Sequence, residues 1–392
     1  MSGDVLRDSD IVCFGAEQWE YPGFQQTVMR HLSANNRVLY INALGLRRTA
    51  LKGKNANIYF AKLKKLFSGT RKASDTVTVF NPFFLPVLYN EYVDKLNTVL
   101  LRQQFRRLLR DLKFSAYLLW AGTPTMAPFL GLFQPRLLIY NPVDRYSAFS
   151  FVDRAGVKKL ERTIAQAANL IITTAEVIKE DMLHYNKNCE VVSHGVLFEH
   201  FNRAVQDLQV PEDLRRIRRP VIGFFGLVSE WVDLELIMKV AHQYPEASIV
   251  LIGRVSADIS LFAGVQNVYV KGFRQFASLP SYLRALDVCI IPFHLTELVD
   301  GVDPIKLREY LCAGKPVVTT NFREARKFGD LIYIGRNHDE FVQEVGRALL
   351  ENDPDLVQRR ILAVRGEDWS SKIELISSLV LNTLNQERAH LA

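Results

Sequence analysis

The chain has 392 residues, of which 48% are hydrophobic and 23% charged, which is enough for two globular domains of ordinary size. It holds no apolar run of about 18 residues and starts with a polar, acidic segment, so we expect neither a membrane-spanning helix nor a signal peptide. The formal net charge of +7 is uneven, because residues 37–113 hold 16 Lys+Arg against 4 Asp+Glu, whereas residues 201–392 hold 23 against 25.

The four cysteines are far apart in the sequence and show no metal-ligand spacing: Cys13, Cys189, Cys289 and Cys312. Widely spaced cysteines in apolar runs are typical of reduced core thiols, so we expect a cytoplasmic protein.

The first half alternates strand and helix patterns. Strands are predicted at residues 11–14, 37–42, 77–80, 116–120, 137–140, 170–173 and 190–193. Helices are predicted after Gly15, near residues 157–169, and at residues 91–113, where one face holds Tyr92, Leu96, Val99, Leu100, Leu108, Leu109 and Leu112. Residues 46–75 are basic and irregular, and residues 81–86 form a turn-rich loop.

The second half repeats this alternation after a polar linker at residues 200–219. Strands are predicted at residues 221–225, 248–252, 268–270, 288–291, 317–319 and 331–334. Helices are predicted near residues 233–243, 278–286, 304–313, 338–350 and 370–386. Alternating strands and helices predict an α/β fold with parallel sheets that carry helices on both faces.

Residues 301–321 are the most informative stretch. Pro304 starts a short amphipathic helix that carries Lys306 and Glu309, and Gly314 ends it before a buried strand. A helix start attracts anions, Lys306 adds a cation, and Glu309 offers a carboxylate to a ribose diol. Taken alone, such a helix fits a scaffold as well as a binding site.

Two further stretches follow strands of the second half. Gly226 ends the segment Gly-Phe-Phe-Gly at the carboxyl end of a strand, where backbone comes close to a phosphate in α/β sheets. Further on come Lys271-Gly272-Phe273, then Leu-Pro-Ser-Tyr-Leu and Asp287-Val-Cys-Ile-Ile-Pro. We interpret Asp287 as a residue that caps or supports its strand.

These stretches, in the order in which they follow one another along the chain, resemble the nucleotide-binding half of group 1, family 4-like glycosyltransferases of the GT-B fold. They look closest to divergent bacterial enzymes of exopolysaccharide and teichuronic-acid assembly. The resemblance implies two Rossmann-like, doubly wound domains with a cleft between them. It implies an acceptor domain at residues 1–200, a nucleotide-sugar domain at 201–369, and a helix at 370–392 that crosses back to the first domain. It also implies that Lys306 binds the diphosphate and Glu309 the ribose, and that the Lys271–Phe273 loop covers the base.

The chain departs from the family pattern at several positions. Gly301 stands where many members have a first glutamate, and Asp300 and Asp303 nearby either contact donor-sugar hydroxyls or cap the helix. Glu230 and Asp233 stand where relatives commonly have Arg and Lys for the diphosphate. The stretch beginning at His194-Gly-Val resembles the family's domain junction, with His194 in place of Asn, so we expect a hinge contact there.

The first domain offers acceptor-site candidates. Asp144 follows a predicted strand, and a carboxylate there could take the proton of an acceptor hydroxyl, although a turn Asp paired with Arg145 fits equally well. Glu17 and Trp19 follow Gly15 and are candidates for the acceptor site, since aromatic faces stack on sugars.

The basic segments 46–72 and 91–113 have three interpretations: a solvated face, a nucleic-acid site or a membrane surface. The chain shows no nucleic-acid motif. Basic side chains beside Phe105, Leu108 and Leu109 suit an interfacial helix on anionic lipid, so we expect a peripheral protein on the inner face of the plasma membrane.

The resulting prediction is a metal-independent glycosyltransferase that has no cofactor. Its donor would be a UDP- or GDP-linked sugar and its acceptor a hydroxyl of a lipid-linked or polysaccharide precursor. The alternatives are a sugar-nucleotide epimerase or hydrolase on the same fold, and a non-catalytic nucleotide-sugar-binding subunit.

Overall fold

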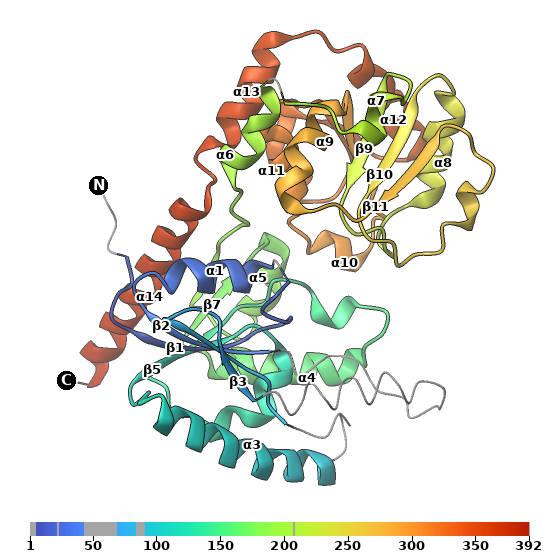
Figure 1. The fold of residues 1–392 in the computed structure, drawn as a ribbon. Coiled ribbons are helices and arrows are strands. Elements are labelled where there is room, and N and C mark those ends of the chain that lie inside the picture. The colour runs from blue at the N-terminus through green and yellow to red at the C-terminus, as the bar shows by residue number, and fades with distance from the viewer. Residues whose placement is uncertain (1–4, 22, 43–68, 84–90, 207, 392) are drawn as a thin grey trace. The chain divides into compact units, whose positions relative to one another are not determined.

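The computed structural model describes residues 5–21, 23–42, 69–83, 91–206 and 208–391. Residues 46–68 of the predicted basic segment and residues 84–86 of the predicted loop 81–86 lie outside the described residues. The chain forms two compact units (Figure 1): unit 1 comprises Met1–Ser193 and Lys372–Ala392, and unit 2 comprises His194–Ser371. The sequence placed the first boundary after residue 200 and the last helix from residue 370. Each unit is described by itself below.

Unit 1 is built on an eight-stranded sheet of order β3-β4-β2-β1-β5-β6-β7-β8, parallel except for β3. Its strands are β1 (Asp10–Phe14), β2 (Arg37–Ile41), β3 (Thr70–Lys72), β4 (Val77–Phe80), β5 (Tyr117–Ala121), β6 (Leu137–Tyr140), β7 (Leu170–Thr173) and β8 (Cys189–Val191). The strand order reverses at β1, which pairs with β2 on one side and β5 on the other. Such a reversal opens a crevice at the carboxyl ends of the strands.

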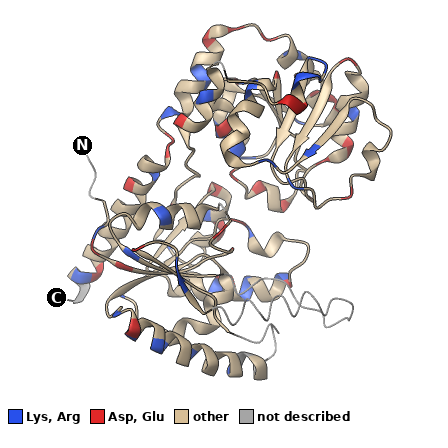
Figure 2. Cartoon of the chain, in the orientation of Figure 1, with Lys and Arg blue, Asp and Glu red and all other residues tan. Residues whose placement is uncertain are grey.

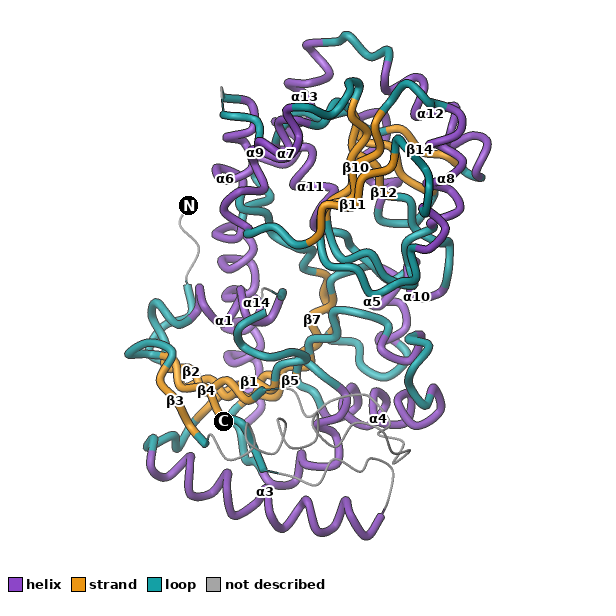
Figure 3. Tube along the Cα trace, turned by 45° about the vertical axis from the view of Figure 1, so that its right-hand side comes forward, coloured by secondary structure: helices purple, strands orange, loops and turns teal. Residues whose placement is uncertain are grey.

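Helices cover both faces of this sheet, with α3 on one side and α1 on the other in Figures 1 and 3. The helices are α1 (Phe24–Leu32), α3 (Glu91–Asp111), α4 (Arg154–Ala167), α5 (Glu176–Leu183) and α14 (Trp369–Leu391), the last of which starts in unit 2. The buried side chains of α14 within unit 1 repeat at helical spacing: Ile373, Ile376, Val380 and Leu384.

Helix α3 turns a different face to the core from the one that the sequence suggested. Leu101, Phe105 and Leu108 are buried against the sheet, whereas Leu96 and Val99 are half exposed and Tyr92 is 84% exposed. The periodicity alone did not distinguish the two overlapping apolar stripes. The interfacial role predicted for Phe105 and Leu108 is therefore wrong, because both side chains lie in the core.

Unit 2 is built on a six-stranded parallel sheet of order β11-β10-β9-β12-β13-β14. Its strands are β9 (Val221–Phe225), β10 (Ser248–Ile252), β11 (Val268–Gly272), β12 (Val288–Ile291), β13 (Val317–Thr320) and β14 (Tyr333–Gly335). The order reverses between β9 and β12, so the carboxyl ends of these two strands flank the crevice in which ligands bind on such sheets. Both units thus have the predicted doubly wound architecture.

The helices of unit 2 are α6 (Phe198–Asn202), α7 (Glu212–Arg215), α8 (Leu234–Gln243), α9 (Leu279–Ala285), α10 (Glu297–Asp300), α11 (Ile305–Cys312), α12 (His338–Leu349) and α13 (Pro354–Arg365). The predicted linker 200–219 instead contains α7 and the end of α6, and its Phe201 and Leu214 belong to the core of unit 2. Helix α13 was missed. Most of its side chains are exposed, and its two buried side chains are Val364, in the core, and the charged Arg360, which pairs with Glu351.

Candidate functional site

The loop after β9 brings backbone to the crevice of unit 2. Gly226 follows the strand with φ +142°, in the left-handed half of the map that favours glycine. Its N–H donates to the carbonyl of Ile252 at 2.9 Å, which ties the loop to β10. Gly253 lies in the adjacent loop, after β10. A Cβ atom at this position would lie 1.9 Å from the Gly226 oxygen, so a side chain there would force the backbone of one of the two loops to move.

Lys306 lies directly over this loop. A Cβ atom at position 226 would be 2.8 Å from Lys306 Cε and 3.2 Å from its Nζ. The ammonium also lies 5.3 Å from the ring centre of Phe224 and 5.0 Å from that of Phe293, within range of cation–π attraction. The structure therefore brings together Gly226 and Lys306, which the sequence had proposed separately for the diphosphate.

Glu309 lies on the same helix, α11, and its side chain is buried. Among the described residues, no hydrogen bond to the Glu309 carboxylate is found. Burial raises its pKa to about 7, an effect that the charge of Lys306 partly offsets, and burial lowers the pKa of Lys306 to about 8. A buried carboxylate without a hydrogen-bond donor is costly, so it is suited to accept hydrogen bonds from a ligand.

Helix α11 is held in place by its own neighbours. The Phe225 N–H donates to the Tyr310 hydroxyl at 3.0 Å, and the two rings meet edge to face at 4.6 Å. Asp303, by contrast, does not cap the helix, because the cap position is Pro304, and one of its carboxylate oxygens accepts from the His194 N–H at 2.9 Å. The Asp303 carboxylate is buried and bonded to Arg308 at 2.6 Å, so the predicted capping role is wrong.

Lys271 and Gly272 lie at the end of β11. Lys271 Nζ donates to the Asp213 carbonyl at 3.0 Å and lies 5.4 Å from the Tyr269 ring, so its ammonium binds the α7 segment. Gly272 has φ +67° and accepts a hydrogen bond from the Gly253 N–H at 2.9 Å. Next to it, Phe273 is 59% exposed, and the Arg254 guanidinium lies 5.0 Å from its ring centre. The loop thus carries exposed backbone and a largely exposed aromatic side chain.

Asp144 follows β6 at the carboxyl edge of the unit 1 sheet, and its side chain is partly buried. Burial raises the pKa of Asp144 to about 6, and the nearby charge of Glu17 raises it further. A guanidinium partner would lower that pKa, and Arg145 instead donates to both oxygens of Asp181, at 2.7 and 2.9 Å. The environment therefore suits a proton acceptor better than a turn ion pair.

Glu17 and Trp19 are in the loop after β1. Glu17 is exposed, and desolvation by the surrounding protein raises its pKa. Trp19 is only 8% exposed, packs on Tyr40 with ring centres 5.0 Å apart, and lies beneath the Arg30 guanidinium. Because the Trp19 side chain is almost fully buried, the structure gives it a packing role in this loop and leaves Glu17 as the accessible group.

Sequence reasoning missed several polar residues at these edges. Gln25 at the start of α1 accepts from the Ala16 N–H and donates to the carbonyls of Gly122 and Asn141, which joins the carboxyl ends of three strands. Arg308, buried on α11, is a further residue that the sequence analysis did not single out. A charged residue on the apolar face of a short helix was the available signal.

Asp233, which stands where relatives have a diphosphate-binding cation, caps α8 through the Leu236 N–H at 2.8 Å and bonds His338 at 2.7 Å. Asp287 accepts from the Val221 N–H at 2.6 Å and pairs with Arg219, which confirms its role as a strand support.

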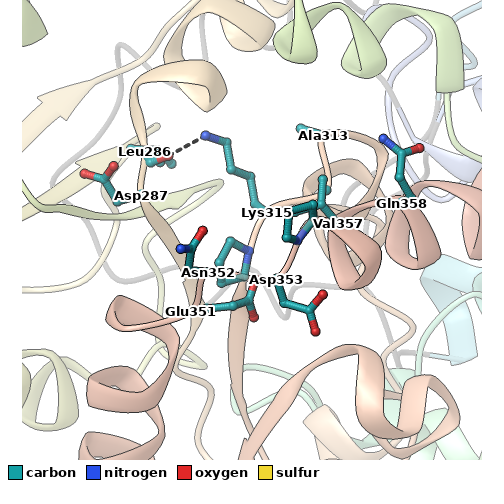
Figure 4. A pocket seen from close by; sticks show the side chains of 12 residues that line it. Leu286, Asp287, Ala313, Lys315, Glu351, Asn352, Asp353, Val357 and Gln358 are labelled. Carbon is teal, nitrogen blue, oxygen red and sulfur yellow. Dashed lines mark hydrogen bonds between the residues drawn. The ribbon is translucent and has the colours of Figure 1, made fainter.

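A hollow lined by Lys315 and Asp287 lies at the opposite edge of the unit 2 sheet (Figure 4). Its walls are the segments that precede β12 and β13 and, across from them, residues 351–358 at the start of α13. The Gly226–Lys306 pair instead lies beyond the carboxyl ends of β9 and β12. Lys315 Nζ is bonded to the carbonyls of Arg284 and Leu286, at 3.0 and 2.5 Å. This hollow is separate from the candidate site.

Within the described part of the chain, no group of three or more His, Cys, Asp or Glu side chains is placed to hold a metal ion. No described helix combines the length and apolar character that crossing a membrane requires.

Comparison with known proteins shows which family and which fold the chain resembles. Residues 219–352 match the family model of the group 1 glycosyl transferases. A Bacillus subtilis (strain 168) protein named as a teichuronic acid biosynthesis glycosyltransferase, TuaH, is 25% identical over 275 residues, which cover 64% of this chain and 68% of that protein.

Solved structures resemble the whole chain in fold. Sucrose-phosphate synthase from Thermosynechococcus elongatus aligns with a TM-score of 0.68 and 14% identity, covering 96% of this chain and 100% of that one. HepE from Anabaena, solved with UDP and glucose, aligns with a TM-score of 0.67 and 13% identity, covering 95% and 99%. The fold is therefore GT-B, as predicted. The protein is a glycosyltransferase, and the group 1 glycosyltransferase domain lies in its second unit.

Proposed function

We propose that the protein transfers a sugar from a nucleoside diphosphate sugar to an acceptor hydroxyl, and that unit 2 binds the donor. The observation that carries this proposal is the arrangement on α11: Lys306 lies over the Gly226 backbone, and the buried Glu309 carboxylate has no hydrogen-bond donor among the described residues. A cation over a glycine loop suits a diphosphate, and a carboxylate three residues further along suits a ribose diol.

UDP is the nucleotide that we favour for the donor, over the GDP alternative. Support comes from HepE, whose structure contains UDP and glucose and whose fold the chain shares. Phe273, which is largely exposed and has the Arg254 guanidinium 5.0 Å from its ring centre, offers the base a stacking surface, and the Gly272 backbone offers hydrogen-bonding groups. In this proposal no metal ion takes part, because Lys306 and the start of α11 would stabilise the charge that develops on the leaving diphosphate.

Asp144 is the residue that we propose as general base in unit 1. Its pKa of about 6 lets it be ionised at neutral pH while keeping it basic enough to accept a proton. Glu17 is the accessible carboxylate beside it and is proposed to contact acceptor hydroxyls.

The proposed acceptor is a lipid-linked or polysaccharide precursor. The name of TuaH places that relative in the synthesis of a cell-wall polysaccharide. Helix α3 supplies a surface that suits anionic lipid. Its exposed apolar residues are Tyr92, Leu96 and Val99, and its exposed basic residues are Lys95, Arg102, Arg106, Arg107 and Arg110. Figure 2 colours the Lys and Arg positions along the helix blue. We therefore propose a cytoplasmic protein that binds the inner face of the plasma membrane peripherally.

Calorimetric titration with UDP tests the donor site. Removing a charge-assisted hydrogen bond costs about 1.5–3 kcal/mol, so Lys306→Ala and Glu309→Ala should each weaken UDP binding roughly 10- to 150-fold. Lys239→Ala is the matched control, because Lys239 is an exposed residue of α8 whose ammonium pairs with Asp339 of α12. If both α11 variants bound UDP as tightly as the parent, the assignment of Lys306 and Glu309 to the donor site would be wrong.

Turnover separates the proposal from its two alternatives. A transferase consumes the UDP-sugar only when an acceptor is added, whereas an epimerase or hydrolase consumes it without one. A non-catalytic subunit binds the donor and consumes none under either condition.

A further inference from the structure

Three charged side chains of unit 2 form a buried network, which we call the crossing network: Asp303, Arg308 and Glu367. Arg308 Nη1 donates to Asp303 Oδ1 at 2.6 Å, and Arg308 Nε donates to Glu367 Oε2 at 2.8 Å. The side chains of Arg308 and Asp303 are 5% and 1% exposed, and that of Glu367 is 33% exposed. One guanidinium thus joins two carboxylates that are far apart in the sequence.

The network is attached to both segments by which the chain passes between the units. The outgoing segment starts at His194, whose N–H donates to Asp303 Oδ2 at 2.9 Å. The returning segment includes Glu367 and ends at Ser371. The two segments are also bonded to each other, because the Val196 N–H donates to the Glu367 carbonyl at 2.9 Å.

Close packing fixes the spacing of these two segments. A Cβ atom at Gly195 would lie 2.9 Å from the Cα of Trp369 and 2.7 Å from its ring, so no side chain fits without a shift. The rings of His194 and Trp369 meet edge to face, with centres 6.5 Å apart. A movement of one segment must therefore displace the other.

Helix α11 carries the donor-binding groups and the network on different faces. Successive helix residues are about 100° apart, so Arg308 lies about 200° around the axis from Lys306. Glu309 is on the same side as Lys306 because it is three residues along. A ligand that draws Lys306 and Glu309 toward itself acts on a short rigid helix whose other face holds both crossing segments.

We propose that Arg308, together with Asp303 and Glu367, is a positioning residue that couples donor binding on α11 to the two segments that connect the units. The proposal rests on the donor site proposed above. Arginine suits this role because its planar, permanently charged fork bonds both carboxylates at once, whereas lysine presents a single ammonium. The network contacts neither reacting group directly, so its loss should affect the transfer step more than donor affinity.

Hydrogen exchange of the full chain with and without UDP tests the coupling. In the parent protein, UDP should slow amide exchange in residues 303–312 and also in the crossing segments 194–197 and 366–371. In Arg308→Lys, UDP should still protect residues 303–312 but not the crossing segments. Turnover should fall about tenfold or more in this variant, while the donor KM stays within about threefold.

Two further variants test the same coupling and leave the donor-binding side of α11 unchanged: Glu367→Gln and Gly195→Ala. Glu367 is partly exposed, so Glu367→Gln decides the question if Arg308→Lys fails to fold. The matched control is Arg326→Lys, because Arg326 is exposed and its bonds go to Asn321. This control should retain the exchange pattern and turnover of the parent.

The outcomes are distinct. Protection of residues 303–312 without protection of the crossing segments in the parent would overturn the coupling and leave the donor site standing. Parent-like protection and turnover in both Arg308→Lys and Glu367→Gln would also overturn it. If UDP protects neither region of the parent, the donor-site proposal fails and the coupling fails with it.

Discussion

Lys306 occupies the space that a side chain at Gly226 would need, since a Cβ atom there would lie 2.8 Å from Lys306 Cε and 3.2 Å from Nζ. The backbone at Gly226, with φ +142°, is itself in a region that other residues rarely adopt. Gly226 therefore serves both the turn after β9 and the position of the ammonium. This relationship leads to the first prediction.

Gly226→Ala should destabilise the protein by about 1–3 kcal/mol through backbone strain and weaken UDP binding by displacing Lys306. Thermal unfolding and calorimetric titration measure the two effects. Gly264→Ala is the matched control, because Gly264 has φ +81° and no atom within 4 Å of an added Cβ. It should lose stability but bind UDP normally. Normal UDP binding by Gly226→Ala would argue against a role for the Gly226–Lys306 contact in donor recognition.

Donor affinity should depend on pH, with an optimum between about 7 and 8. Glu309, whose pKa burial raises to about 7, becomes an acceptor for the ribose as pH rises through that value. Lys306, whose pKa burial lowers to about 8, loses its charge as pH rises further. Titrations with UDP from pH 6 to 9.5 should therefore give a bell-shaped profile.

Lys306→Arg separates the two limbs of that profile. Because arginine keeps its charge throughout this range, the variant should lose the alkaline limb and retain the acidic one. An alkaline limb that persists in Lys306→Arg would show that another group titrates there.

Asp144→Asn should slow transfer by about 10²–10⁴ while UDP affinity stays unchanged, because general-base catalysis contributes that much to turnover. In the parent, kcat/KM should rise with pH through about 6, where Asp144 loses its proton. Glu17→Gln should move this limb to lower pH, because the negative charge of Glu17 raises the pKa of Asp144. Asp153→Asn, at the start of α4, is the control carboxylate. Parent-like turnover by Asp144→Asn would leave Asp144 as a loop residue.

Binding to anionic vesicles should depend on α3. Each Lys or Arg near an anionic leaflet contributes about 1 kcal/mol, so reversing Arg102, Arg106 and Arg110 to Glu should abolish co-sedimentation at low salt. Reversal of Lys158, Lys159 and Arg162 on α4 changes the charge equally and should have a smaller effect. High salt should weaken binding by the parent, because exposed charges are screened. Equal binding of the parent to neutral and anionic vesicles would instead indicate a solvated basic face.

Much of the fold followed from the sequence because strands and helices depend on local patterns. The predicted strands at residues 77–80, 137–140 and 221–225 coincide with β4, β6 and β9. Lys306 and Glu309 were predictable as a pair because they are three positions apart on one helix and therefore lie on the same side of it. Helix α13 was not, since its side chains are mostly exposed and it carries no strong apolar stripe.

The sequence by itself determined the doubly wound architecture, the glycine loop after β9 and the short helix that carries Lys306 and Glu309. Only the tertiary structure decided which groups remain available. Trp19 lies beneath Arg30, Lys271 is bonded to the Asp213 carbonyl, and α3 buries Phe105 rather than Tyr92. The Arg308–Glu367 pair joins residues 59 positions apart. Such pairings form when separate elements pack together and exclude water from the surfaces between them. The spacing of residues within one element does not determine which surfaces these are.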